Sequence, residues 1–296
     1  MRSILAPYGA VAAVVTFALA GAASARADTT DGQALTSANW AGYEVDASSP
    51  DQQFSKVSGS WVQPNADCSS GGGDAAFWVG LGGGGSGATG LEQVGTEVDC
   101  SGEGDPQSQA WYELIPAAPV PLDLTITPGD HVSASVEVEG NAVTVALKDD
   151  TTGKGVTKNL TTQNIDVSSA EWVAEAPSAC DSESGCQPVT LANFGQVAIT
   201  NASATAADHS GTISDPQWSG SPLQLAAADG ASGGAMPSSL SDNGGSFTVA
   251  WQQGATQSTQ PDPSAGGHGG GYGGGGWDGY GGGSPYGYGA DPGFSF

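Results

Sequence analysis

Positively charged residues are scarce in this sequence of 296 residues. Lysine and arginine together number six, against 31 aspartates and glutamates. Both arginines, Arg2 and Arg26, lie within the first 27 residues, so residues 28–296 carry four lysines, 31 acidic side chains and a formal charge of −27. Proteins that bind phosphate backbones need clustered lysine and arginine. The composition therefore excludes nucleic acid as a partner.

Long apolar runs are missing as well, with one exception at the N-terminus. Residues 4–20 are largely apolar, follow the basic start Met1-Arg2 and precede the small-x-small sequence Ala25-Arg26-Ala27, with residues 23–25 as an alternative cleavage site. This pattern is typical of a secretory signal peptide. We predict that residues 1–27 are removed and that the protein is secreted and extracellular. No later run is long enough to span a bilayer, so we expect no membrane association after removal.

The shortage of cations also favours an acidic environment. Carboxyl groups have reference pKa values near ~4, so most of them become neutral in acid, where few lysines remain to repel one another. The net charge is then low at about pH 3 to 4. We interpret the chain as a secreted protein suited to acid; the alternative is an acidic composition that serves solubility alone.

The chain has few residues of the kinds that hold metals or cofactors. Its four cysteines suggest two disulfides in a secreted protein. The spacing favours Cys180–Cys186, around a polar loop, and therefore Cys68–Cys100, but three connectivities are possible. There is no CxxC pair and the three histidines are scattered, which argues against a metal site. The glycine run 80–85 follows a strand but precedes no helix, so we predict no dinucleotide and no other cofactor.

Helical periodicity is absent, and the pattern from Asn39 onward is that of short strands separated by Gly, Pro, Asn and Asp. This predicts an all-β fold, an antiparallel β-sandwich, with one domain over residues 38–253. A short segment, 28–37, precedes the domain, and the Gly/Tyr-rich residues 254–296 form a low-complexity tail that cannot build a core, so we predict disorder there. The predicted strands are 40–45, 54–62, 75–81, 91–99, 109–115, 131–138, 142–148, 156–160, 170–176, 197–203 and 247–251.

Two of these strands carry polar side chains on one face. In the strand 91–99, alternation places Gln93 and Glu97 on one face, with Gly95 between them leaving room. In the strand 170–176, Glu171 and Glu175 share a face. Each face has two interpretations, a substrate cleft or a solvated sheet surface.

Familiar catalytic arrangements of other kinds are not found. None of the histidines, at positions 131, 209 and 268, has nucleophile-elbow surroundings, and there is no HExxH sequence. The paired Asp-Thr/Ser-Gly motif of aspartic proteases is also missing. Carboxylates are the candidates that remain.

Five separated motifs together resemble the glutamic peptidases, also called eqolisins. They are Asn39-Trp40-Ala41-Gly42-Tyr43, Phe77-Trp78-Val79-Gly80, Leu91-Glu92-Gln93-Val94-Gly95, Ala110-Trp111-Tyr112-Glu113 and Ala170-Glu171-Trp172-Val173-Ala174-Glu175-Ala176-Pro177. Their order and spacing are similar to the family pattern from about residue 39 to residue 203. The loop between Cys180 and Cys186 also resembles a short disulfide loop of that family.

The resemblance implies a fold, an activity and a site. The fold would be a sandwich of the concanavalin A-like lectin and glucanase type, and the activity that of a secreted, pepstatin-insensitive acid endopeptidase acting on polypeptides. The catalytic pair would be Gln93 and Glu175, and Trp40 and Trp78 would line the substrate cleft. Three further residues are candidate supporting carboxylates: Glu97, Glu113 and Glu171. We expect a monomer.

The implied chemistry is physically reasonable. Peptide hydrolysis needs an activated water, a donor to the tetrahedral oxyanion and a proton for the leaving amine. Glu175 as a carboxylate can take the proton of water and return it to the amine, while Gln93 can donate to the oxyanion and accept from the water. Whether Glu175 begins the reaction as acid or as base is left open by the sequence.

Two other functions remain possible. Paired carboxylates such as Glu171 and Glu175, with Trp40, Trp78 and Trp111 stacking on sugars, would suit a glycan-active enzyme. A lectin-like module without catalysis is the third hypothesis.

Overall fold

The computed structural model describes residues 34–49, 52–70, 72–84, 88–100, 105–181, 185–226 and 233–254. The predicted signal peptide and almost all of the predicted tail lie outside these ranges. Within them the helical segments are two short 3-10 turns, Cys68–Ser70 and Asp242–Gly244. Within the same ranges no helix is long and apolar enough to cross a membrane. The all-β prediction is confirmed.

Eighteen strands make up the described chain. They are β1 (Leu35–Ser37), β2 (Trp40–Ala47), β3 (Phe54–Val62), β4 (Asp74–Gly82), β5 (Leu91–Asp99), β6 (Gln107–Ile115), β7 (Val120–Pro121), β8 (His131–Glu139), β9 (Ala142–Asp149), β10 (Lys154–Thr161), β11 (Ser169–Glu175), β12 (Ser178–Asp181), β13 (Gly185–Pro188), β14 (Gln196–Ala206), β15 (His209–Gly211), β16 (Trp218–Leu225), β17 (Gly234–Pro237) and β18 (Phe247–Gln252). All eleven predicted strands overlap one of them.

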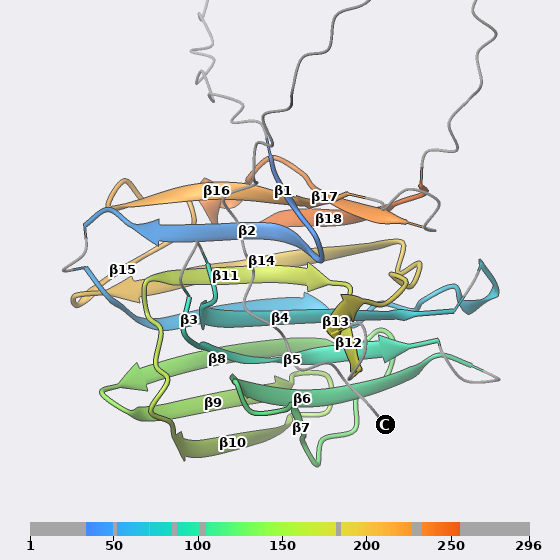
Figure 1. The fold of residues 1–296 in the computed structure, drawn as a ribbon, viewed down its shortest axis with the longest axis horizontal. Helices are drawn as coiled ribbons and strands as arrows, with labels where there is room; N and C mark the ends of the chain where they lie inside the picture. The colour runs from blue at the N-terminus through green and yellow to red at the C-terminus, as the bar shows by residue number, and fades with distance from the viewer. Residues whose placement is uncertain are drawn as a thin grey trace, which may run out of the picture. The chain divides into compact units, whose positions relative to one another are not determined.

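Sixteen of these strands form one long sheet that folds over into two layers, and β12 and β13 form a separate two-stranded sheet (Figure 1). The order of the long sheet is β10-β9-β8-β3-β14-β18-β17-β16-β2-β11-β4-β5-β6-β7, and the pairs are antiparallel except for β1 with β16. The corner is β14, because its residues 196–199 pair with β18 whereas residues 200–206 pair with β3. We call β3, β8, β9 and β10 the back layer, and β2, β11, β4, β5 and β6 the front layer.

The main hydrophobic core lies between these layers. Alternate residues of the facing strands are buried, as in β8, where Val132, Val136 and their neighbours alternate with exposed side chains. Burial of this apolar surface is the main force that holds the layers together. Two side-chain hydrogen bonds fix how the layers align with each other. The Trp61 indole donates to Thr96 Oγ1 at 2.9 Å, and the Trp172 indole donates to the Ser58 carbonyl at 2.7 Å.

One disulfide joins the 3-10 turn that precedes β4 to the residue that follows β5. Cys68 and Cys100 are bonded, with Cα atoms 5.2 Å apart, so this half of the predicted pairing is confirmed. Cys186 is also disulfide-bonded, and it lies opposite Cys180 in the β12–β13 ladder. The side chain of Cys180 lies outside the described residues, so the bond between these two cysteines stays a prediction.

The sequence did not reveal β16. Its sequence, WSGSPLQL, has a central proline and small polar residues, which normally indicate a loop. Pro222 pairs with Tyr43 of β2, and pairing on its other side begins only at Leu223 with β1. The missing N–H of proline is tolerated because it faces no partner strand.

Candidate active site

The face of the front layer that points away from the main core carries the polar residues singled out in the sequence. Directly paired residues of neighbouring strands point to the same face of a sheet, so the pairing register defines three rows across β11, β4, β5 and β6. The first row is Glu171, Gly80, Gln93 and Glu113; the second is Val173, Trp78, Gly95 and Trp111; the third is Glu175, Ala76, Glu97 and Gln109.

Gln93 and Glu175 therefore lie on the same face, on strands separated only by β4. Their rows flank the row of Trp78, so the two side chains stand diagonally across its indole. A smaller apolar cluster, distinct from the main core, lies on this face: Trp40, Ala76, Trp78, Leu91, Trp111, Val173 and Leu223. The polar pair thus sits among large apolar side chains, where water competes less for hydrogen bonds.

The Glu175 carboxyl is held by two N–H donors. The Asn39 side-chain amide donates to Oε1 at 2.8 Å, and the Trp78 indole donates to Oε2 at 2.7 Å. Glu175 is only 3% exposed and Trp78 is fully buried. Trp40 pairs with Glu175 across β2 and packs edge-on against Trp78, with ring centroids 5.0 Å apart. Both tryptophans that were expected to line a cleft therefore stand beside this carboxyl.

Gln93 is fixed by a carboxyl of the next strand. Its Nε2 donates to Glu113 Oε2 at 2.7 Å, and both residues are buried. The amide has a second N–H, and its carbonyl oxygen accepts no hydrogen bond from the described residues. The arrangement leaves one donor and one acceptor of Gln93 available for a ligand.

Two glycines make room for these side chains. A Cβ at Gly95 would lie 2.3 Å from the Phe77 carbonyl oxygen and 2.6 Å from the Trp78 Cβ. A Cβ at Gly80 would lie 2.9 Å from the Trp78 ring. Both glycines are therefore required by the position of Trp78.

Buried carboxyls gather at one end of this face, beyond Glu175. Burial, then Asp74 and Asp99, raises the pKa of Glu97 to about 8. Burial, then a hydrogen bond with Asp99, raises the pKa of Asp74 to about 7. Asp74 and Asp99 are paired across β4 and β5. These groups hold their protons well above the usual range of carboxylic acids.

A second group of carboxyls lies at the opposite end, where the Gln93 row continues onto β11 and β2. Glu171 and Glu44 are paired across β11 and β2. Burial, then the neighbouring Glu44, raises the pKa of Glu171 well above its usual value, and burial, then Asp46, raises the pKa of Glu44 to about 7. On the core side of β5, burial raises the pKa of Glu92 to about 8. No pattern in the sequence indicated that these acids would be buried together without a lysine beside them.

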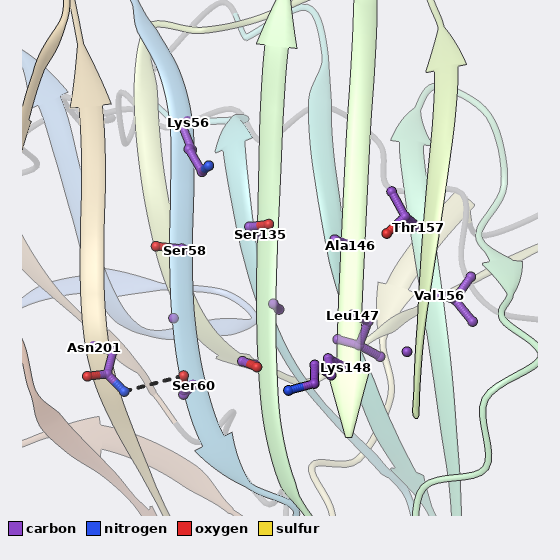
Figure 2. Close-up of a pocket in the computed structure, with 14 residues that line it drawn as sticks. Lys56, Ser58, Ser60, Ser135, Ala146, Leu147, Lys148, Val156, Thr157 and Asn201 are labelled. Carbon is purple, nitrogen blue, oxygen red and sulfur yellow. Dashed lines mark hydrogen bonds between the residues drawn. The ribbon is translucent and has the colours of Figure 1, made fainter. Parts of the chain in front are cut away.

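The lysines lie elsewhere. Lys56, Lys148, Lys154 and Lys158 belong to β3, β9 and β10 of the back layer. A shallow hollow of about 640 Å³ lies on the outward face of that layer, lined by Lys56 and Lys148 and by small residues such as Ser58 and Ser135 (Figure 2). It contains no carboxyl side chain, so it offers neither the acid nor the base that the front layer offers.

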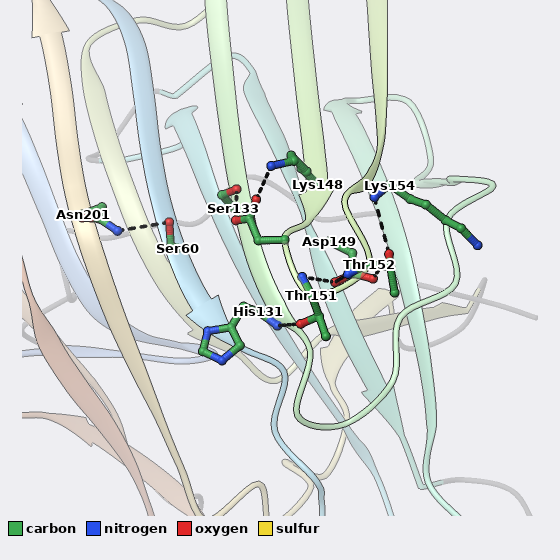
Figure 3. A network of polar contacts seen from close by, with 10 residues as sticks. Ser60, His131, Ser133, Lys148, Asp149, Thr151, Thr152, Lys154 and Asn201 are labelled. Atoms are coloured by element: carbon green, nitrogen blue, oxygen red, sulfur yellow. Dashed lines mark hydrogen bonds and ion pairs between the residues drawn. The ribbon is translucent and has the colours of Figure 1, made fainter.

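A hydrogen-bond network at the end of the back layer surrounds a carboxyl whose pKa is lowered, not raised as in the front layer (Figure 3). The hydroxyl and N–H groups of Thr152 and Thr151 donate to the Asp149 carboxyl, which lowers its pKa. The Thr151 hydroxyl also accepts from the His131 N–H at 2.8 Å. These contacts fix a turn, whereas Oε2 of Glu97 accepts no hydrogen bond from the described residues.

Comparisons of the sequence and of the structure with known proteins agree on one family. The model of the Peptidase A4 family matches residues 38–229. Aspergillopepsin-2 from Aspergillus niger is 28% identical over 223 residues, which cover 66% of this chain and 75% of that protein. Scytalido-glutamic peptidase, solved with a transition state analog inhibitor, has a TM-score of 0.61 at 24% identity, covering 73% of this chain and 98% of that one. SCP-B, an eqolisin in a complex with the tripeptide Ala-Ile-His, has a TM-score of 0.57 at 24% identity, with the same coverage.

The family match spans more than half of the chain, so the chain belongs to the Peptidase A4 family, the glutamic peptidases or eqolisins. The similarity to the two solved structures shows that the fold is the β-sandwich of these enzymes. The protein is accordingly a hydrolase of the glutamic endopeptidase type, and the resemblance drawn from the five motifs is confirmed.

The structure brings the predicted site residues together and adds one that was not singled out. Gln93, Glu113 and Glu171 share a row, and Glu97 shares the row of Glu175. The addition is Asn39, whose side chain contacts Glu175 directly. Its place in the first motif, next to Trp40, was the available signal. Among the described residues, no group of three or more His, Cys, Asp or Glu side chains is arranged to hold a metal ion.

The raised pKa values predict a stability that falls as the pH rises. In an unfolded chain carboxyls titrate near ~4, so between pH 4 and 8 the unfolded chain releases protons that the folded protein still binds at Glu44, Asp74, Glu92 and Glu97. The free energy of unfolding then decreases with pH, by about 1.4 kcal/mol for each pKa unit of difference. Urea unfolding at pH 4 and pH 7 measures this. Glu97→Gln should reduce the difference, and equal stability at the two pH values would contradict the account.

Gly95→Ala is expected to destabilise the protein by roughly 1–3 kcal/mol, as overpacking of a core does. The added methyl would overlap a backbone oxygen, which cannot move without shifting β4. Gly245→Ala is the control, because its Cβ would meet its nearest atom at 3.3 Å. Thermal unfolding of both variants at pH 4 tests the difference, and an unchanged melting temperature for Gly95→Ala would show that the packing here is looser than described.

Proposed function

We propose that this protein is a secreted acid endopeptidase in which Glu175 is the general base and acid and Gln93 stabilises the oxyanion. The observation that carries the proposal is the shared face: a carboxyl held by donors and an amide with a spare donor and acceptor flank the same buried tryptophan. The tripeptide Ala-Ile-His in the structure of SCP-B supports a polypeptide substrate.

The reaction follows from these groups. Glu175 takes a proton from a water molecule, and the resulting hydroxide attacks the carbonyl carbon of the peptide. The carbonyl oxygen becomes an oxyanion, to which the second N–H of Gln93 donates. Glu175 then passes its proton to the amide nitrogen, the C–N bond breaks and the amine leaves. Glu113 holds the Gln93 amide in one orientation, so the donor is in place before the charge develops.

Acid conditions suit this mechanism and this chain. A carboxylate base works best when the ambient pH is close to its own pKa. The buried acids of the front layer are neutral in acid and repel one another once they ionise. We therefore propose an acid optimum together with secretion, a monomeric state and insensitivity to pepstatin.

The glycan-active alternative fits the structure less well. Glu171 and Glu175 are four residues apart on one strand, which places their Cα atoms about 13 Å apart at 3.3 Å per residue. A retaining glycosidase needs its carboxyls about 5 to 5.5 Å apart. Their surroundings also differ, because Glu175 receives two N–H donors and Glu171 lies beside another carboxyl.

Activity assays at pH 3 to 4 with denatured casein and with β-glucan test the function. Glu175→Gln and Gln93→Ala should each lower kcat/KM on casein at least about 100-fold, in the range expected for loss of a general base or an oxyanion donor. The control is Glu139→Gln, an exposed acid at the end of β8. Full casein cleavage by either site variant would remove that residue from the mechanism, and cleavage of glucan would favour the alternative.

Gln93→Glu is expected to be nearly inactive as well, although it preserves the shape of the side chain. A carboxyl has no amide donor, and it would face Glu113 across the distance now spanned by a hydrogen bond of 2.7 Å. The two acids would then compete for one proton. Steady-state kinetics on casein at several pH values checks this result; wild-type activity would show that the amide donor is not needed.

A further inference from the structure

The contact between Asn39 and Glu175 joins positions 136 residues apart. Asn39 is 9% exposed, and its amide nitrogen points at Glu175 Oε1. Since the Trp78 indole donates to the other oxygen, each carboxylate oxygen has its own N–H donor. The Trp78 indole can only donate, and the Asn39 amide donates through the nitrogen that faces the carboxyl.

The backbone around Asn39 is fixed from three sides. Its carbonyl accepts a hydrogen bond of 2.9 Å from the N–H of Ala176, the residue next to Glu175. The Ser37 hydroxyl accepts from the Trp40 N–H at 3.0 Å and from the Asn39 N–H at 3.4 Å. Ser37 itself ends β1, which pairs in parallel with β16. The N-terminal strand therefore positions the Asn39 side chain beside the Glu175 carboxyl.

The other titratable groups that the structure places around Glu175 on this face are acids. On β5, Glu97 occupies the same row, and on β4 Asp74 lies one row further. On its own strand Glu171 lies two rows away, and β2 places Trp40 opposite. The four lysines lie on strands of the back layer. With acids and no lysine placed beside it, Glu175 is favoured in its charged form by the N–H donors of Asn39 and Trp78, because hydrogen bonds to the charged form stabilise it.

We propose that Asn39 is a positioning residue that keeps Glu175 ionised and in a single orientation before substrate binds, so that Glu175 enters the reaction as the base. The inference rests on the proposed function, in which Glu175 takes the proton of water. It also answers which form of Glu175 begins the cycle. Both oxygens accept better from N–H donors when the carboxyl is ionised, so the two contacts favour the carboxylate over the protonated acid.

Asn39→Asp tests the proposal because it keeps the shape of the side chain and replaces the donor by a carboxyl. Two acids would then share one proton, so the acid limb of the kcat/KM profile should move upward by about one pH unit or more. Below that limb kcat should fall at least about tenfold with KM changed less than about twofold, as expected when ground-state binding is untouched. Asn39→Ala should move the limb in the same direction by less.

Asn141→Asp is the matched control, since Asn141 is an exposed residue of the β8–β9 turn and gains the same charge. The position of the acid limb does not depend on how much of a preparation is folded, so a destabilised variant still gives a result. A wild-type pH profile in Asn39→Asp, with Glu175→Gln inactive, would overturn the role of Asn39 and leave the catalytic pair intact. An active Glu175→Gln would instead overturn the proposed function itself.

Discussion

The antiparallel register of β11, β4 and β5 is the constraint on which the rest of the site depends. A shift of one residue in either pairing would turn Glu175 or Gln93 toward the main core. The register is secured on the core side by the apolar face of the same strands, and at the ends of β4 and β5 by the Cys68–Cys100 bond. Residues that never contact the substrate therefore decide whether the carboxyl and the amide share a surface.

The second constraint is electrostatic. A chain with four lysines beyond its first 27 residues has few cations to place beside buried acids, and the structure places all four on the back layer. The acids of the front layer are consequently stabilised by their protons, which ties folding to acid conditions. Glu175 differs from them because two N–H donors hold its carboxyl.

Much of this could be predicted from the sequence. Alternation located the central strands, and five motifs identified the family together with Gln93 and Glu175 as candidates. The register could not be predicted, because alternation assigns residues to a face within one strand but does not align neighbouring strands. The contact from Asn39 depends on that alignment. The burial of Glu44, Asp74 and Glu92 was missed for a related reason: an acidic residue in a strand usually faces solvent, and only the packed structure shows which ones do not.

Strand β16 shows the limit of local propensity. Its proline and small polar residues suggest a loop, but its place beside β2 and β1 makes it a strand of the sheet.

The structure also shows why the first motif matters. Trp40 and Asn39 begin the front layer and reach the carboxyl that ends the last motif. The sequence places these two motifs far apart, and the fold makes them neighbours.

A double-mutant cycle on Gln93 and Glu175 tests the central claim most directly, which is that the two side chains act on the same water and the same peptide bond. The measurement is kcat/KM for casein at pH 3 to 4 in wild type, Gln93→Ala, Glu175→Gln and the double variant. Groups that act as a unit are strongly non-additive, so the double variant should be about as slow as the slower single variant. Losses that multiply would show two independent contributions and would contradict a joint site.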